Sequence, residues 1–470
     1  MLRAEKQLLL RGFLGQLPEH VAARLAKAVE VDRLIGGTGL PHDAILRALR
    51  PQNRTLPDRR TPTQTPQRCF CRPFEDILVS TDRSIKQKGR IARNSLDAVW
   101  NWLADDLMPS RYREITQSLQ ESILDGPEAE VTEKCEELWA ETAATLKLEL
   151  STDKKKMFAA KILGGMAIVE DAAEMALLLG AAHEIVELQA RLPRPVPNLT
   201  EENISFLRDC FERLSNSNPD LAPYVPLIVL GRLERPWEAL RLVSVLAHKT
   251  TDTVISNTDL GIVGELLFSD LDVYVKKIQA ARPMDFDAEA LATSLAGFAE
   301  LSTGMVKELG IRRGGRWGQH LGKDKGAVAQ VFEGLLERAP KEIQAVLAGT
   351  KASWFGKGPK PLDLSHAPDP DHSDRALRYA HLMRHSKPFA VAAAFSAKLN
   401  EVFDETTNLL RGYSEDLLRE FRAATPETRT NVDLHWTLLI ELCTSVLGEE
   451  ETDLLRRRAR VPMKAQSSHP

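Results

Sequence analysis

Long uninterrupted apolar runs are missing from this sequence. No stretch of its 470 residues approaches the roughly 18 consecutive apolar residues that a transmembrane helix needs. Residues 1–20 carry Lys6 and Arg11 inside their apolar stretch, and no cleavage-site pattern follows, so they do not resemble a signal peptide. The sequence therefore predicts a cytoplasmic protein without a transmembrane segment.

Cysteine is also scarce. The five cysteines are scattered and odd in number, which is typical of a reducing compartment rather than of a disulfide framework. The pair Cys69 and Cys71 is spaced too tightly for a zinc knuckle, and no second pair accompanies it. We interpret these residues as incidental thiols.

Aromatic residues make up only 6% of the chain, whereas Ala and Leu are abundant, which favours helices over sheets. With 43% hydrophobic and 27% charged residues, the chain has the composition of a globular protein with a sizeable core. No repeat with a period of 30 to 45 residues is apparent. The predicted fold class is all-α, an irregular multi-helix bundle or an α-solenoid-like array with a small N-terminal helical module.

Apolar residues at helical spacing locate the predicted helices more closely. The long stretch 154–192 is expected to kink or split at Gly164-Gly165 and at Gly180. Two Gly- and Pro-rich stretches, 311–325 and 351–372, are predicted to be loops. The other helices are predicted at 111–124, 128–150, 201–215, 221–233, 236–248, 259–280, 287–309, 373–385, 388–411, 414–423 and 427–447, with a helix pair in 325–349.

The known catalytic signatures are absent: the sequence has no GxSxG, HExxH, GxGxxG or paired CxxC. Gly-Lys occurs in the stretches 318–324 and 349–358, but without the spacing or the following Ser or Thr of a phosphate-binding loop. The Glu-x-x-His motif of di-iron bundles is missing as well. We therefore expect no cofactor and favour a non-enzymatic protein.

What stands out in the sequence is a basic, proline-broken segment, residues 50–93. It holds eleven Lys and Arg against four Asp and Glu, a net charge of +7, whereas the remainder of the chain carries −11. Residues 50–68 have the composition of a linker. Residues 69–93 contain Phe70, Phe74 and Ile77, and are expected to be fastened to the helical body, with a short strand or turn in 70–79.

This segment divides the predicted organisation of the chain. The expected parts are an N-terminal helical module at 1–49, a basic linker at 50–93, a first helical domain at 94–192, a second at 199–460 with a possible sub-boundary at 350–372, and a disordered tail at 461–470.

Basic residues suggest one candidate site, because Lys and Arg neutralise phosphates and neighbouring aromatic rings stack on bases. The candidate nucleic-acid or anion-binding residues lie in 50–93 and in the stretches 312–325 and 351–360. They are Arg59, Arg60, Arg68, Arg72, Lys86, Lys88, Arg90, Arg312, Arg313, Arg316, Trp317, Lys351, Trp354 and Lys357. Alternatively, the basic segment lies along the acidic body and pairs with its carboxylates.

Histidines gather in a second candidate site. Four of the eleven lie within twenty residues, and two of them are four residues apart on a predicted helix. Imidazole and carboxylate groups suit zinc, manganese or iron. The candidate metal ligands are His366, Asp371, His372, His381 and His385. The competing interpretation is a loop with a helix N-cap, which places acids where the helix dipole favours them.

Residues 2–17 form an amphipathic helix with three basic residues. Docking on the protein's own body is favoured over contact with a membrane surface. The function predicted from the sequence is a cytoplasmic scaffold or adaptor whose partner is another protein, an inference from fold class and from the absent motifs. The alternatives are a nucleic-acid-binding protein and a metal-dependent hydrolase at His366–His385.

Overall fold

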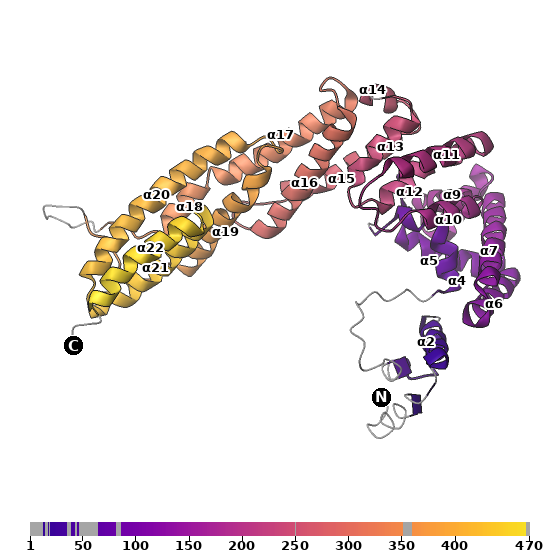
Figure 1. Cartoon of the computed structure of the whole chain (residues 1–470), viewed down its shortest axis with the longest axis horizontal. Coiled ribbons are helices and arrows are strands. Elements are labelled where there is room, and N and C mark those ends of the chain that lie inside the picture. Colours follow the sequence, from indigo (N-terminus) through magenta and orange to yellow (C-terminus); the bar gives the residue numbers. More distant parts are fainter. Residues whose placement is uncertain are drawn as a thin grey trace. The chain divides into compact units, whose positions relative to one another are not determined.

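The computed structural model describes residues 13–14, 17, 19–34, 39–42, 45–46, 64–80, 86–249, 251–350 and 360–466 (Figure 1). These residues confirm the predicted all-α fold class, because the described chain contains only two short strands among its helices. The chain divides into two compact units, residues 1–235 (unit 1) and residues 236–470 (unit 2). The predicted helix at 2–17 lies largely outside the described residues.

Unit 1 contains all the described strand structure. Its elements are α2 (Glu19–Leu34), α4 (Pro66–Cys71), η1 (Arg72–Ile77), β1 (Leu78–Val79), β2 (Ile91–Ala92), α5 (Arg93–Trp102), η2 (Leu103–Leu107), α6 (Pro109–Asp125), α7 (Glu128–Glu149), α8 (Asp153–Leu163), α9 (Met166–Leu179), α10 (Ala182–Arg191), α11 (Glu201–Ser217), η3 (Pro219–Leu221) and α12 (Tyr224–Arg232).

Helix α9 forms the centre of the unit 1 core and packs against α5, α7, α8, η1 and β2. Its sequence, MAIVEDAAEMALLL, is apolar around most of the helix, which is typical of a helix buried on several sides. The splits predicted at 164–165 and at 180 are present. Gly164, with a φ of 91°, ends α8 in the left-handed conformation that favours glycine, and α9 ends before Gly180.

Residues 69–79 are fastened to this body, as their apolar side chains predict. Phe70 and Phe74 are fully buried and their rings pack edge to face. Asp76 receives a hydrogen bond of 2.7 Å from the buried guanidinium of Arg232, and Gln189 donates to the same carboxylate. Strand β1 then pairs with β2 in parallel, with Leu78 opposite Ile91.

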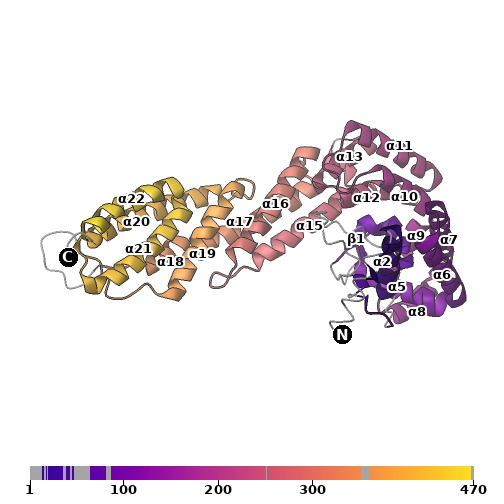
Figure 2. The same ribbon diagram turned by 60° about the horizontal axis from the view of Figure 1, so that its bottom comes forward.

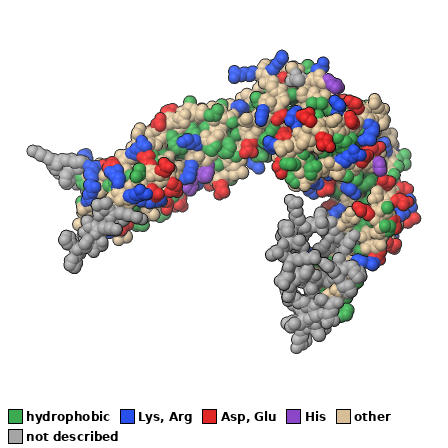
Figure 3. Space-filling model, in the orientation of Figure 1, with side chains coloured by type: hydrophobic (Ala, Val, Ile, Leu, Met, Phe, Trp, Pro, Cys, Tyr) green, Lys and Arg blue, Asp and Glu red, His purple; other side chains and the backbone are tan. Residues whose placement is uncertain are grey.

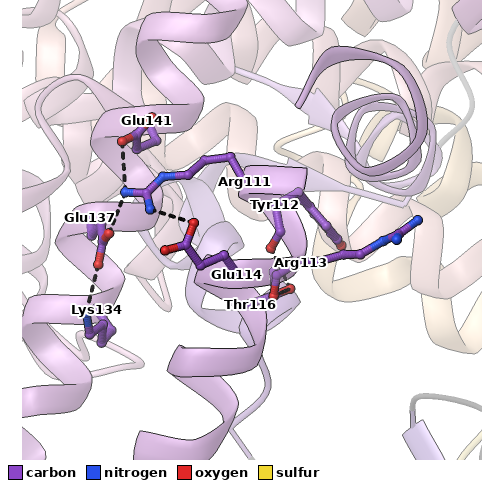
Figure 4. Close-up of polar contacts among 8 residues, drawn as sticks. All are labelled: Arg111, Tyr112, Arg113, Glu114, Thr116, Lys134, Glu137 and Glu141. Carbon is purple, nitrogen blue, oxygen red and sulfur yellow. Dashed lines mark hydrogen bonds and ion pairs between the residues drawn. The ribbon is translucent and has the colours of Figure 1, made fainter. Parts of the chain in front are cut away.

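Helices α6 and α7 are joined at the surface by charges (Figure 4). Arg111 of α6 lies between three carboxylates, those of Glu114 on its own helix and of Glu137 and Glu141 on α7. Lys134 pairs with Glu137 from the other side. Such exposed networks set orientation more than stability.

Unit 2 is built almost entirely of helices in its described residues. Its elements are η4 (Pro236–Glu238), α13 (Ala239–Leu246), α14 (Asp252–Ile255), α15 (Gly261–Gln279), α16 (Ala288–Leu309), α17 (Arg316–Leu336), α18 (Ala339–Val346), α19 (Pro370–Ser386), η5 (Lys387–Phe389), α20 (Ser396–Ala423), α21 (Pro426–Val446) and α22 (Glu449–Gln466).

The helices of this unit pack in an unbroken series of contacts. Helix α15 contacts α16 and α17, and α19 contacts α16, α18 and α21. Helices α20, α21 and α22 run beside one another, as Figure 2 shows. Large aromatic side chains pack against glycines where helices meet: a Cβ on Gly264 would lie 2.3 Å from the ring of Trp317, and one on Gly304 would lie 2.3 Å from Trp237. These glycines let the helices approach closely.

Several predicted boundaries differ from the structure. The stretch predicted as a loop at 311–325 is helical from Arg316 onward. The helices predicted at 388–411 and 414–423 form the single helix α20 after a turn. The predicted boundary at 192–198 lies inside unit 1, where Val196 exchanges backbone hydrogen bonds with Arg232 and Glu234. Helix α22 extends through residues 461–466 of the predicted tail.

Candidate docking face

Large apolar side chains are exposed around helix α8 of unit 1. Met157 is 63% exposed and Phe158 is 66% exposed, and Ile162, Leu148 and Met166 are also exposed. These five belong to fifteen such side chains among the described residues, and they fall within residues 148–166. Figure 2 shows α8 at the outside of unit 1. Grouped exposed apolar side chains mark interaction sites more often than scattered ones do.

The local sequence fixes which side of α8 faces outward. Thr152 caps the first turn by accepting a hydrogen bond from the backbone N–H of Lys155, and Gly164 ends the helix. Ala159 and Leu163 are the buried residues of this helix. Since successive residues are rotated by about 100°, Met157 and Phe158 project to the opposite side.

Lysines surround these apolar side chains. Helix α8 has the sequence DKKKMFAAKIL, with four lysines and one acidic residue. On the same helical rotation, Lys154 and Lys161 project between Met157 and Phe158. Neither lysine has a carboxylate partner among the described residues, whereas Lys155 pairs with Glu149. We define Lys154, Met157, Phe158, Lys161 and Ile162 as the α8 face. It can bury apolar groups and bind carboxylates at once.

Part of the positive charge of the basic segment is neutralised by carboxylates of the helical body. Lys86 is largely shielded from solvent and forms ion pairs with Asp171 and Glu174 of α9, and its Nζ also donates to the backbone carbonyl of Arg90. Its ammonium group is therefore engaged by carboxylates of the helical body. Lys88 is exposed.

Glu174 and Asp171 bind the segment 86–95 through its backbone and side chains. Glu174 accepts hydrogen bonds from the backbone N–H of Gly89 and from the hydroxyl of Tyr224. Asp171 accepts hydrogen bonds from the backbone N–H of Ala92 and from the hydroxyl of Ser95. The alternative in which this part of the basic segment pairs with body carboxylates matches these contacts.

Two other predicted residues, Arg68 and Arg72, line a cavity of about 750 Å³ in unit 1. Cys69, Cys71 and Cys135 line the same cavity. A hydrogen bond from the Cys135 thiol lowers the pKa of Cys69, and the Arg72 guanidinium adds to this effect. Arg59 and Arg60 lie outside the described residues.

Around α17, the predicted basic and aromatic loop is mostly helix. Trp317, a predicted base-stacking residue, is 1% exposed, so its ring lies inside the protein. Arg316 pairs with Glu265, whereas Arg312 and Arg313 are exposed before the helix begins. Lys351, Trp354 and Lys357 lie outside the described residues. On the face drawn in Figure 3, basic and acidic side chains are interspersed rather than gathered in one basic band.

The predicted histidine cluster is brought together only in part. His381 and His385 lie side by side on α19, with ring centroids 6.3 Å apart, and line a cavity of about 490 Å³ with Arg384 and Arg456. Asp371 and His372 occupy the first turn of α19, capped by Asp369, and the carbonyl of His366 faces His435. Metal binding by these five residues stays a prediction.

One group of potential metal ligands was not predicted. Asp272, His320 and Asp324 are the only described His, Cys, Asp or Glu side chains that place three donor atoms within 4.8 Å of one another. The spacing of His320 and Asp324, four residues apart, was visible in the sequence. This spacing brings two side chains together only on a helix, and residues 311–325 were predicted to be a loop.

No protein-family model, curated protein or solved structure matches the chain. None of the helices within the described ranges is both long and apolar enough to cross a membrane.

Proposed function

We propose that this protein is a non-enzymatic cytoplasmic scaffold or adaptor that binds an acidic amphipathic segment of another protein on the α8 face. The single observation that carries the proposal is the exposure of Met157, Phe158 and Ile162 among unpaired lysines. All five cysteines are free, which supports a reducing compartment.

The order of side chains around α8 favours a protein over a membrane surface. Helices that lie in a membrane separate an apolar sector from a charged sector. On α8, Lys154 and Lys161 instead project between Met157 and Phe158, so inserting both apolar side chains into lipid would bury the ammonium groups as well. A partner helix with carboxylates between its apolar side chains meets both requirements.

The same face is poorly suited to nucleic acid. A phosphate backbone would satisfy Lys154 and Lys161 but offers no apolar surface to Met157 or Ile162. Elsewhere, Lys86 is ion-paired with Glu174 and Trp317 is buried, and both had supported the nucleic-acid alternative.

Affinity is expected to be modest. Helix α8 has 11 residues and is therefore roughly 16 Å long, which limits the contact to less than a standard interface of about 800 Å² per partner. Weak contacts escape ordinary pull-down, so covalent capture is the appropriate measurement.

The test places a photo-crosslinking amino acid at Asp153, which is exposed and precedes Met157 by four residues on α8, in the full-length chain expressed in its native host. Crosslinked peptides are identified by mass spectrometry, with and without the double change Met157→Ser and Phe158→Ser. The matched control is Val391→Ser, because Val391 is 80% exposed and lies in unit 2.

We expect a crosslink to one partner protein, at a segment of that partner that carries carboxylates. The crosslink should be lost in the double variant and retained in Val391→Ser. Equal crosslinking in all three proteins would refute the proposal. Vesicles of phosphatidylcholine with phosphatidylserine provide the second arm. Vesicle binding that the double variant abolishes, without a crosslinked protein, would replace the protein partner with a membrane surface.

A further inference from the structure

Two carboxylates and one imidazole converge where α15 meets α17 in unit 2. Nε2 of His320 lies 3.0 Å from Oδ1 of Asp272 on α15 and 3.4 Å from Oδ2 of Asp324, one turn further along α17. We call these three residues the α15–α17 cluster. It is independent of the α8 face, which belongs to unit 1.

The surrounding core holds the imidazole in place. The ring of Phe268 stacks on the ring of His320, with centroids 4.7 Å apart and planes within 21°. Phe268 is itself buried and precedes Asp272 by four residues, so ring and carboxylate share one side of α15. A turn earlier, Trp317 donates a hydrogen bond of 3.0 Å to Glu265, which fixes α17 against α15. The three donor atoms therefore rest on two packed helices.

Asp324 lacks the partners that a buried carboxylate needs. It is 5% exposed, and its Oδ2 has no hydrogen bond within the described part of the chain. Nε2 of His320 can carry one proton, and its better-placed acceptor is Asp272. A cation between the three side chains would supply what is missing.

The two separations from Nε2 of His320 to the carboxylate oxygens match those between ligands in a coordination sphere. Ligands bound to zinc at about 2.0–2.2 Å stand about 3.3–3.6 Å apart in a tetrahedron, and adjacent ligands of an octahedral ion stand about 3.0 Å apart at similar bond lengths. The observed 3.0 Å and 3.4 Å lie at these values. One imidazole with two carboxylates suits zinc, manganese or iron(II), whereas calcium prefers oxygen ligands alone.

We propose that Asp272, His320 and Asp324 bind one divalent first-row transition-metal ion, with water completing its coordination. Asp272 and His320 are each about two-fifths exposed, at 41% and 37% of their side chains, so solvent can reach the ion. Asp324 lies on the buried side of the cluster. The ion would join α15 to α17.

The test uses the tag-free, full-length protein, stripped with chelator and titrated separately with Zn²⁺ and Mn²⁺ by calorimetry. Asp272→Asn is the main variant, because this half-exposed side chain can lose its charge without altering the core. His320→Gln is the second variant. His183→Gln is the matched control, an exposed histidine on α10 of unit 1 that belongs to neither candidate metal site. Circular dichroism establishes that each variant is folded.

We expect one equivalent of metal per chain for the unaltered protein and for His183→Gln. Affinity should fall by about 10- to 100-fold in Asp272→Asn and further in His320→Gln. Bound Co²⁺ should show visible absorption bands whose intensity reports its geometry. No stoichiometric binding, or binding that Asp272→Asn and His320→Gln leave unchanged, would overturn the proposal and leave the cluster as a hydrogen-bonded ion pair.

Discussion

The ammonium group of Lys86 lies 2.5 Å from Oδ1 of Asp171, across 85 residues of sequence. Glu174 is its second partner, and both carboxylate side chains are 5% exposed. Removing one member of such a buried ion-paired group leaves a charge without a partner. The resulting loss in folding free energy is larger than the net stabilisation that the intact group provides. The contact therefore fastens the basic segment to α9.

Lys86→Met is expected to lower the free energy of unfolding by about 3–5 kcal/mol, because it leaves two buried carboxylates facing each other. Lys88→Met, at an exposed position two residues away, should change it by less than about 0.5 kcal/mol. Urea denaturation followed by circular dichroism measures both. Similar effects from the two variants would mean that the Lys86 pairs do not stabilise unit 1.

Gly304→Ala and Gly334→Ala should have effects of opposite sign. A Cβ at Gly304 would collide with the ring of Trp237, and overpacking of this kind costs about 1–3 kcal/mol. Gly334 is exposed on α17 with no atom near its missing Cβ, so alanine should add up to about 1 kcal/mol through helix propensity. Thermal melts of the two variants compare them directly. A stabilised Gly304→Ala protein would show that α16 and Trp237 are not in close contact.

Cys69 should react with iodoacetamide before Cys71, although Cys71 is the more exposed of the two. The hydrogen bond from Cys135 lowers the pKa of Cys69, whereas burial raises the pKa of Cys71 to about 12, and the thiolate is the reactive form. Peptide mass spectrometry after timed labelling at pH 7.5 gives both rates. Cys135→Ala should slow the labelling of Cys69. Faster labelling of Cys71 in the unaltered protein would contradict the prediction.

Stability should fall as the pH drops below about 6.5, the ordinary pKa of histidine, in part through His435. Burial lowers the pKa of His435, so the unfolded chain binds a proton that the folded chain resists. Its Nε2–H donates to the carbonyl of His366, and its Nδ1 faces the hydroxyl of Tyr413. Stability is therefore fully present above that pH and is lost as the pH falls through the lowered pKa.

Melting temperatures between pH 7.5 and 5.5 test this, with His435→Gln expected to show a shallower decline than the unaltered protein. The same substitution at the exposed His372 serves as the control. If His435→Gln and the unaltered protein decline in parallel, other groups account for the loss.

Many of the helix positions could be predicted because the residues that end helices act locally. Gly164-Gly165 and Gly180 separate α8, α9 and α10 where the sequence predicted, since glycine acts through the backbone at its own position. The first part of helix α17, up to residue 325, was missed for the same reason. Its glycines, such as Gly318 and Gly322, resemble those of a loop, but the buried Trp317 and Leu321 hold the helix through distant contacts.

The candidate sites depended on information that the sequence does not hold. The sequence predicted the helical stretch that contains α8, but only the packing of Ala159 and Leu163 shows that Met157 and Phe158 face outward. Asp272 and His320 lie 48 residues apart, and nothing in either local sequence points to the other. Helix spacing could suggest His320 with Asp324, but the third ligand required the tertiary fold.

The link between Lys86 and Glu174 also bears on the order of folding. These residues are separated by 88 positions, so their contact closes a long loop, and such contacts form late because chain entropy opposes them. During synthesis Lys86 leaves the ribosome well before α9 exists. Until closure, Asp171 and Glu174 remain hydrated. Unit 1 therefore acquires its final stability only after α9, and then the hydroxyl of Tyr224 from α12, have arrived to complete the site that receives Lys86.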